Sequence, residues 1–123
     1  MTDYPSRFYE QERYAGSIET LTGERPVSAV VLMGRTKFTR TQHLVRTPTH
    51  LVLVSPSAFG RSARAVVGTL QRSDVTEGEG KDWARLQIRG RNWFVLQGYE
   101  PRYARDELRR VLAPEIGDDA PPA

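Results

Sequence analysis

The sequence predicts a mainly β fold, a small β-barrel or sandwich of five to seven strands with a short C-terminal helix or final strand. Three observations support this prediction. Short runs of β-branched and apolar residues recur along the chain between loops rich in Gly and Pro. The stretch 83–99 has the pattern of a β-hairpin. A stretch near the C-terminus has apolar residues at helical spacing.

The hairpin is the clearest element. Leu86 and Ile88 alternate with polar residues, which gives one apolar and one polar face. Gly90-Arg91-Asn92 is the expected turn, because Gly and Asn tolerate positive φ. Trp93–Leu96 is apolar on both faces, so we expect both faces to be covered and the earlier strands to assemble on this one.

The N-terminal residues 1–16 form an arm rich in aromatic side chains. Ser6 is placed to cap a short helix that continues to Tyr14, but an extended arm is equally compatible with the pattern. The density of aromatic residues predicts that the arm is packed. We favour packing on its own domain over packing on a neighbouring subunit.

The middle of the chain contains most of the expected strands. They are Ser17–Leu21, Val27–Met33, Thr36–Thr41 (strand or loop), His43–Thr47, Thr49–Ser55 and Ala63–Gln71. Thr22–Pro26 and Pro56–Ser62 are expected loops. Pro48 places the fourth and fifth strands at an edge or a bend, and Gly68 indicates a bulge.

The C-terminal part supplies the remaining elements. Ser73–Asp82 is acidic and rich in glycine, which predicts a solvated hairpin loop. Arg102–Ala113 has a helical apolar stripe, with a strand at Glu107–Leu112 as the competing interpretation. Residues 114–123 are expected to be a disordered tail, so 1–113 forms a single β-rich domain.

Composition narrows the class of protein. The chain has 123 residues, of which 38% are hydrophobic and 27% charged, as in soluble globular proteins. It has no cysteine, which excludes disulfides and thiolate chemistry. No signal peptide and no membrane span are expected, and a cytoplasmic location fits this pattern.

No catalytic motif stands out. His43 and His50 lack a third metal ligand nearby in the sequence and are expected to be ordinary surface or edge histidines. The carboxylate pairs are expected to be solvated, and no nucleophile-elbow spacing is present. We therefore expect a protein that is not an enzyme and that has no catalytic residue, no metal and no cofactor.

The charge distribution is the remaining signal. Pro26–Ser73 contains seven basic residues and no acid; because the whole chain carries +3, the rest carries −4. The candidate residues for docking or for facing a polyanion are Arg35, Lys37, Arg40, Arg46, Arg61 and Arg64. One interpretation is a docking surface for acidic protein, including head-to-tail contacts between subunits.

The second interpretation is a small β-barrel that binds nucleic acid through this basic stretch, with Phe38 or Phe59 stacking on bases. If the basic stretch is a docking surface for protein, the candidate residues of the subunit-contact loops are Phe38, Phe59, Glu77 and Glu79. A third, a small intracellular partner-binding domain, stays open. A solvated surface that happens to be basic is the simplest alternative.

The order of elements also has a counterpart among known families. Thr22-Gly23-Glu24 comes early, the hairpin Leu86–Gly98 comes late, and Asp106–Leu112 closes the chain. In this outline the chain resembles the head–tail joining (stopper, or head-closure) proteins of tailed bacteriophages. Those proteins usually close with a strand, whereas this chain has helical periodicity there.

The resemblance implies a non-enzymatic structural protein of the virion. It would be one subunit of an oligomeric ring in the neck, assembled in the host cytoplasm between the portal-side adaptor and the tail. Its partners would be other protein subunits, with weak contact to DNA and none to membrane. The segments Thr36–Gln42 and Ser73–Asp82 would be candidates for gating or subunit contact.

Overall fold

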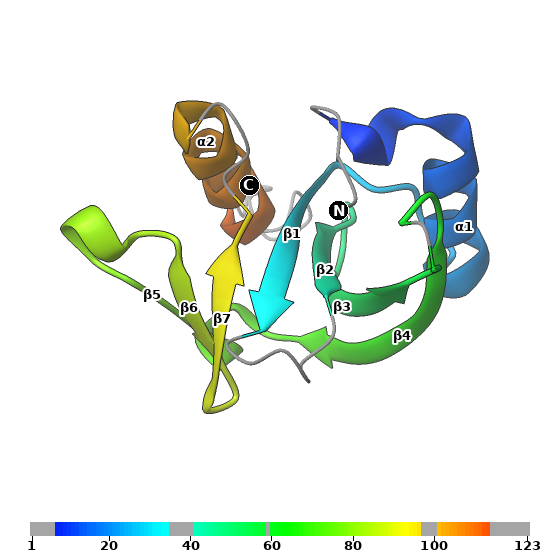
Figure 1. The fold of residues 1–123 in the computed structure, drawn as a ribbon. Coiled ribbons are helices and arrows are strands. Elements are labelled where there is room, and N and C mark those ends of the chain that lie inside the picture. Colours follow the sequence, from blue (N-terminus) through cyan, green and yellow to red (C-terminus); the bar gives the residue numbers. More distant parts are fainter. Residues whose placement is uncertain (1–6, 35–40, 59, 97–100, 114–123) are drawn as a thin grey trace, which may run out of the picture.

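The fold is one seven-stranded antiparallel sheet with a helix on each face (Figure 1). The computed structural model describes residues 7–34, 41–58, 60–96 and 101–113. The strand order is β4-β3-β2-β1-β7-β6-β5. The strands are β1 (Ser28–Gly34), β2 (Gln42–Arg46), β3 (Leu51–Pro56), β4 (Ala63–Leu70), β5 (Val75–Glu77), β6 (Arg85–Ile88) and β7 (Arg91–Val95).

Two α-helices and three short 3₁₀ helices complete the described structure. They are η1 (Phe8–Glu10), α1 (Glu12–Thr22), η2 (Arg72–Asp74), η3 (Gly80–Asp82) and α2 (Pro101–Leu112). Neither α-helix has the length and apolar character that crossing a membrane requires, a finding limited to the described residues.

Alternating side chains divide the core into two layers. On β1, Val30 and Leu32 pack with the apolar stripe of α2, while Ala29 and Val31 pack with α1 and η1. This is the period of two that a strand imposes, and it explains why β1 is apolar on both faces. The predicted mainly β fold is therefore confirmed, but as a single sheet that does not close into a barrel.

The sheet curls around the layer that contains α2. The curl brings the turn between β6 and β7 close to β4, where Nη2 of Arg89 donates to the carbonyl oxygen of Thr69 at 3.1 Å. Leu53 of β3 pairs with Gly68 of β4, but the next residue, Val54, pairs with Val66. The register therefore shifts by one residue at this point of β4. The predicted bulge at Gly68 is thus confirmed, and such a bulge bends its strand.

The hairpin is confirmed, with its turn one residue earlier than predicted. Arg91 pairs with Ile88, so the turn residues are Arg89 and Gly90, with φ of 50° and 84°. Two residues with positive φ characterise the tight turn that suits the twist of a hairpin. β7 lies between β1 and β6, where Trp93 is buried as expected.

Two predictions of secondary structure are wrong. Ser17–Leu21 belongs to α1 and is not a strand, because Tyr14 and Ile18, one helical turn apart, are both buried against the sheet. Ser73–Asp82 is not a simple solvated loop, because it contains β5, which pairs with β6. Thr36–Thr41 lies almost wholly outside the described residues.

The aromatic arm packs on its own domain, as favoured. Phe8, Tyr9 and Tyr14 are buried, and the rings of Phe8 and Tyr14 meet edge to face with centroids 5.0 Å apart. The hydroxyl of Tyr14 lies 2.7 Å from Nδ1 of His43 on β2. This contact ties α1 to the middle of the sheet.

The C-terminal element is a helix, as its spacing predicted. Leu108, Val111 and Leu112 of α2 are buried in the layer on the inner side of the curl. Glu107 is also buried, and its carboxylate accepts a hydrogen bond from Arg110 at 3.2 Å. Burial and a hydrogen bond to Glu107 raise the pKa of Tyr9. This hydrogen bond joins α2 to the N-terminal arm.

Candidate interface for assembly

One edge of the sheet is long, partly apolar and unpaired. β4 is eight residues long, and no strand among the described residues pairs with its outer side. Val66 is 37% exposed and Val67 52% exposed, which makes them two of the four large hydrophobic residues exposed in the described structure. Unpaired edges with apolar side chains readily add another strand.

Both ends of β4 are capped, and its middle is not. At the first residue, the amide of Ala63 donates to Oγ of Ser17 on α1 at 2.8 Å. Near the last residue, the carbonyl of Thr69 accepts the hydrogen bond from Arg89. The segment between them, Arg64–Val67, is exposed and is the part of the edge left for another chain.

Two of the predicted docking arginines lie at the N-terminal end of this segment, where Arg64 is its first residue and Arg61 precedes β4. Arg61 and Arg64 are exposed, and no described residue lies within ion-pair distance of either. Their positive charge is therefore not neutralised within the described structure. An acidic partner surface is the complement that such a pair of guanidinium groups favours.

The prediction that Arg46 is a docking residue is wrong. β2 is an interior strand, and Arg46 lies on the face that α2 covers, where it is 5% exposed. Its Nε donates to the carbonyl oxygen of Val111 at 3.0 Å. Arg46 thus caps the end of α2. Arg35, Lys37, Arg40, Phe38 and Phe59 lie outside the described residues.

The opposite edge carries the predicted acidic contacts. Glu77 is on β5 and not in a loop, and its carboxylate pairs with Arg72 at 2.6 Å. Glu79 is exposed just before η3. The edge strand β5 is only three residues long, so this side presents acidic groups on a short and guarded strand.

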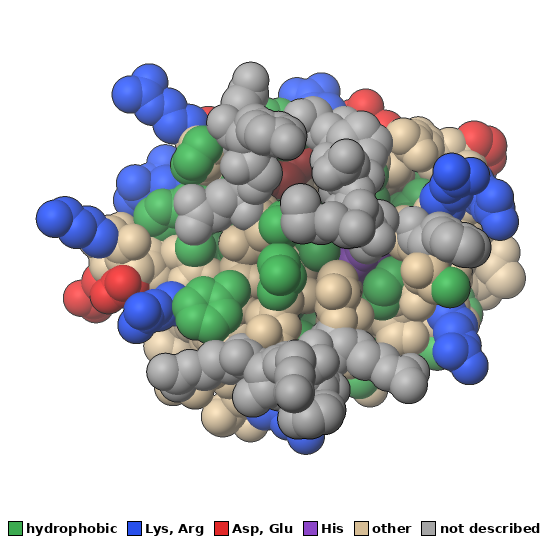
Figure 2. All heavy atoms as spheres, viewed as in Figure 1, with side chains coloured by type: hydrophobic (Ala, Val, Ile, Leu, Met, Phe, Trp, Pro, Cys, Tyr) green, Lys and Arg blue, Asp and Glu red, His purple; other side chains and the backbone are tan. Residues whose placement is uncertain are grey.

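Basic side chains do not gather into one patch on the face that Figure 2 displays. Among the described residues drawn there, Lys and Arg lie around the margin of the view, and hydrophobic side chains lie between them. Single-strand binders of the small-barrel type align basic and aromatic groups along one groove. The described part of this face lacks that arrangement.

The loop after α1 is anchored by a polar cluster. Oε1 of Glu24 accepts hydrogen bonds from the hydroxyls of Thr47 at 2.8 Å and Thr49 at 2.5 Å, and lies 3.2 Å from Nδ1 of His50. These bonds, the Thr49 hydroxyl first, lower the pKa of Glu24 to about 2. The cluster fixes the β2–β3 turn that contains Pro48.

His43 is not the surface or edge histidine that the sequence predicted. It is fully buried on an interior strand, and burial lowers the pKa of His43 to about 3, so the ring is neutral at neutral pH. His50 is exposed beside Glu24. The described residues include no group of three or more His, Cys, Asp or Glu side chains placed to hold a metal ion.

The exposure of Val66 and Val67 was missed at the level of sequence. Ala63–Gln71 was recognised as a strand, but a run of apolar residues at an edge has the same pattern as a run in the core. Only the strand order shows that β4 is an edge.

The comparisons with known proteins give no relative. No family model, no curated protein and no solved structure matches the chain. The basis for a functional proposal is therefore the fold and its surface chemistry.

Proposed function

We propose that the chain is a non-enzymatic structural assembly protein whose copies join edge to edge, as subunits of a ring in the neck of a tailed bacteriophage. The observation that supports assembly is the exposed middle of β4, Arg64–Val67. A protein that stays monomeric ordinarily shortens, charges or covers such an edge. The bacteriophage setting rests on the resemblance in element order alone.

The two sheet edges favour a head-to-tail arrangement. The edge at β4 offers apolar side chains and two arginines, Arg61 and Arg64, with which no described residue forms an ion pair. The region of β5 offers the exposed Glu79 and also Glu77, whose charge Arg72 offsets. When one surface of a subunit meets a different surface of the next, repeated contacts close into a ring or extend into a filament. Edge-to-edge contact in this order places opposite charges together.

The alternative function, nucleic-acid binding through the basic stretch, is less well supported. Arg46 is buried, and Arg61 and Arg64 lie at the start of an apolar edge, where the described residues form no aromatic groove. No described aromatic residue lies on β4 beside them.

The test of assembly is the mass of the protein in solution across a range of concentrations. The proposal predicts a species larger than one chain, and Val66→Lys should weaken assembly by roughly tenfold or more, because a charge would enter a strand-to-strand contact. Met33→Lys is the matched control, since Met33 is 44% exposed but lies on the interior strand β1.

A monomer at every concentration would contradict the proposal for the isolated protein. A wild-type oligomer that Val66→Lys and Met33→Lys weaken equally would place the contact elsewhere. To test the bacteriophage setting, the protein is mixed with tailless phage heads, and the proposal predicts that it binds at the neck vertex.

A further inference from the structure

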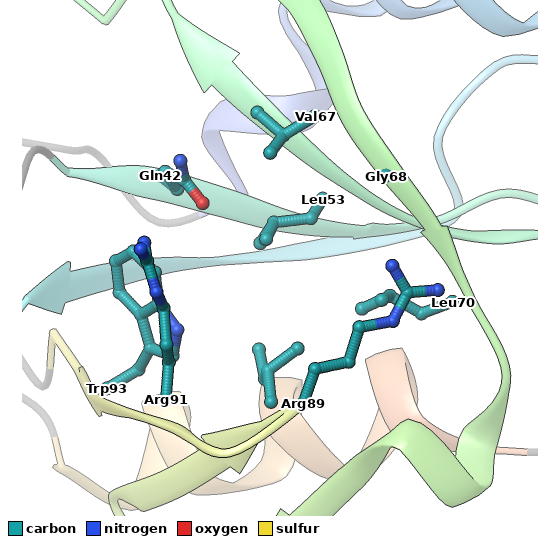
Figure 3. A pocket seen from close by; sticks show the side chains of 9 residues that line it. Gln42, Leu53, Val67, Gly68, Leu70, Arg89, Arg91 and Trp93 are labelled. Carbon is teal, nitrogen blue, oxygen red and sulfur yellow. The ribbon is translucent and has the colours of Figure 1, made fainter.

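A cleft opens on the inner side of the curled sheet, between β4 and the β6–β7 hairpin (Figure 3). Its volume is about 230 Å³. Its floor is apolar and belongs to the core: Leu53, Leu70, Ile88 and Trp93 line it, and each is less than 8% exposed. A fixed apolar floor with a few polar groups at the rim is the usual form of a ligand site.

Two arginines from the hairpin stand at the rim. Arg89 has a φ of 50°, a left-handed conformation that is unfavourable for a residue with a side chain. Its guanidinium is held by the carbonyl of Thr69 at 3.1 Å and lies 3.6 Å from Oδ2 of Asp74. The strained backbone and these contacts fix the Arg89 side chain across the mouth of the cleft.

Arg91 supplies the positive charge that is not neutralised. It lies two residues before Trp93 on β7, so both side chains are on the same side of the sheet. No described residue forms an ion pair with Arg91, and no carboxylate lines the cleft. The negative charge of Asp74 offsets the positive charge of Arg89. The charge of Arg91 then leaves the rim with a net positive charge suited to one anionic group.

Gln42 adds a buried acceptor. Oε1 of Gln42 is buried and has no hydrogen-bond partner among the residues that the structure describes. Figure 3 shows the Gln42 amide across the cleft from the Arg89 side chain. An unsatisfied buried oxygen is unfavourable, so turning the Gln42 amide to meet an N–H or O–H of a ligand in the cleft gains free energy.

We propose that this cleft binds a nucleotide unit. The phosphate lies at the rim against Arg91 and Arg89, and the base lies over the apolar floor. The Gln42 amide turns toward the base, and an N–H of the base donates to its Oε1. A nucleotide combines an anionic group, a flat and largely apolar body, and N–H donors. Inorganic phosphate would leave the floor and Gln42 unused, and an apolar ligand would leave the arginines unused.

This site differs from the predicted nucleic-acid surface in its cationic residues. Those residues are on the β6–β7 hairpin and not in the stretch 26–73. It borders the assembly contact at Val67, which lines the cleft, whereas Val66 does not line it. Binding and assembly are therefore tested by different variants.

The test is a nuclear magnetic resonance titration of the labelled full chain with adenosine monophosphate, adenosine, inorganic phosphate and an adenine hexanucleotide. The indole signal of Trp93 should shift, while that of Trp83, which does not line the cleft, should stay. The monophosphate should bind about tenfold or more tightly than adenosine. The hexanucleotide offers six nucleotide units, so its affinity rises from their number alone. If it binds more tightly than that number explains, the natural ligand is a nucleotide of a single strand.

Two variants test the roles at the rim. Arg91→Gln should remove most of the advantage of monophosphate over adenosine, and Gln42→Leu should weaken both about fivefold. Arg109→Gln is the control with the same charge change, because Arg109 is exposed on α2 and pairs with Asp106. Folding of each variant is checked by its unaltered spectrum away from the cleft.

Three results would overturn the proposal. One is no shift of Trp93 with millimolar monophosphate in the correctly folded wild-type protein. Another is equal binding of the monophosphate by Arg91→Gln and Arg109→Gln. The third is a Trp93 shift caused by an acidic peptide but not by any nucleotide, which would identify a peptide site.

Discussion

The two edges of the sheet show how this chain protects one open strand and leaves the other available. At β5, the guanidinium of Arg72 donates to the carbonyl of Val75 at 2.8 Å and pairs with Glu77 at 2.6 Å. At β4, the residues between the two capped ends have no such cover. Edge strands are normally guarded, so this contrast is the observation on which the proposed contact of β4 with another chain rests.

The edges also differ in how they are fastened to the molecule. β4 depends on α1, which in turn is held by Tyr14 and the buried His43. β5 depends on β6 and on local contacts such as Arg89 with Asp74 at 3.6 Å. The β4 side should therefore respond to changes in the aromatic layer, and the β5 side should respond much less.

The largest expected effect comes from removing the anchor of α1. Tyr14→Ala should lower the free energy of unfolding by about 3–5 kcal/mol, the usual effect of deleting a buried aromatic side chain. Chemical denaturation measures it. Native-state hydrogen exchange should show α1 and β4 losing more protection than β5 and β6; equal losses in both regions would mean that the anchor serves the whole sheet.

Acid should act on the same anchor. The pKa of His43 is about 3 in the fold and 6.5 in the unfolded chain, so the unfolded state binds more protons as pH falls. Above pH 6.5 the ring is neutral in both states and adds no pH dependence. As pH falls from 6.5 to 3 the fold is progressively destabilised, by up to about 5 kcal/mol. Denaturation at several pH values measures this slope, which His43→Phe should remove.

Glu24 provides an internal reference for that titration. Its pKa of about 2 lies below the ordinary value of 4.5, so its contribution is complete above pH 4.5 and is lost between pH 4.5 and 2. Glu24→Gln should leave the slope between pH 6.5 and 4.5 unchanged. A change in that range would show that His43 is not its source.

The smallest effect is expected at the guarded edge. Glu77→Gln removes the pair with Arg72, but both side chains are well exposed, so the free energy of unfolding should fall by no more than about 0.5 kcal/mol. Thermal unfolding at low and high salt measures it. A loss of several kcal/mol would mean that β5 contributes far more to the fold than its length suggests.

Local patterns predicted many elements of this fold. The alternation in β6, the β-branched runs of β1 to β4 and the helical stripe of α2 gave these elements close to their observed bounds. α1 was partly missed, because Ser17–Leu21 has strand-forming residues and its helical face becomes evident only against the sheet. Here tertiary packing decides the local structure.

The candidate surfaces were harder to predict because they depend on strand order and curl. Arg46 has the same local pattern as an exposed arginine, and its burial follows from the position of β2 inside the sheet. The cleft joins Gln42 to Arg91 across the curl, and no sequence spacing indicates that pairing. The acid-free stretch includes the exposed Arg64 and the buried Arg46, and its pattern does not show which arginines reach the surface.

A charge-swap experiment tests the edge-to-edge account most directly. Arg64→Glu and Glu79→Arg are made singly and together, and the mass of each protein in solution is measured by light scattering across a range of concentrations. The account predicts that each single variant assembles more weakly than wild type and that the double variant recovers, because the proposed head-to-tail contact places Arg64 of one copy opposite Glu79 of the next. If assembly of the double variant is weakened by the sum of the two single effects, the result contradicts the account.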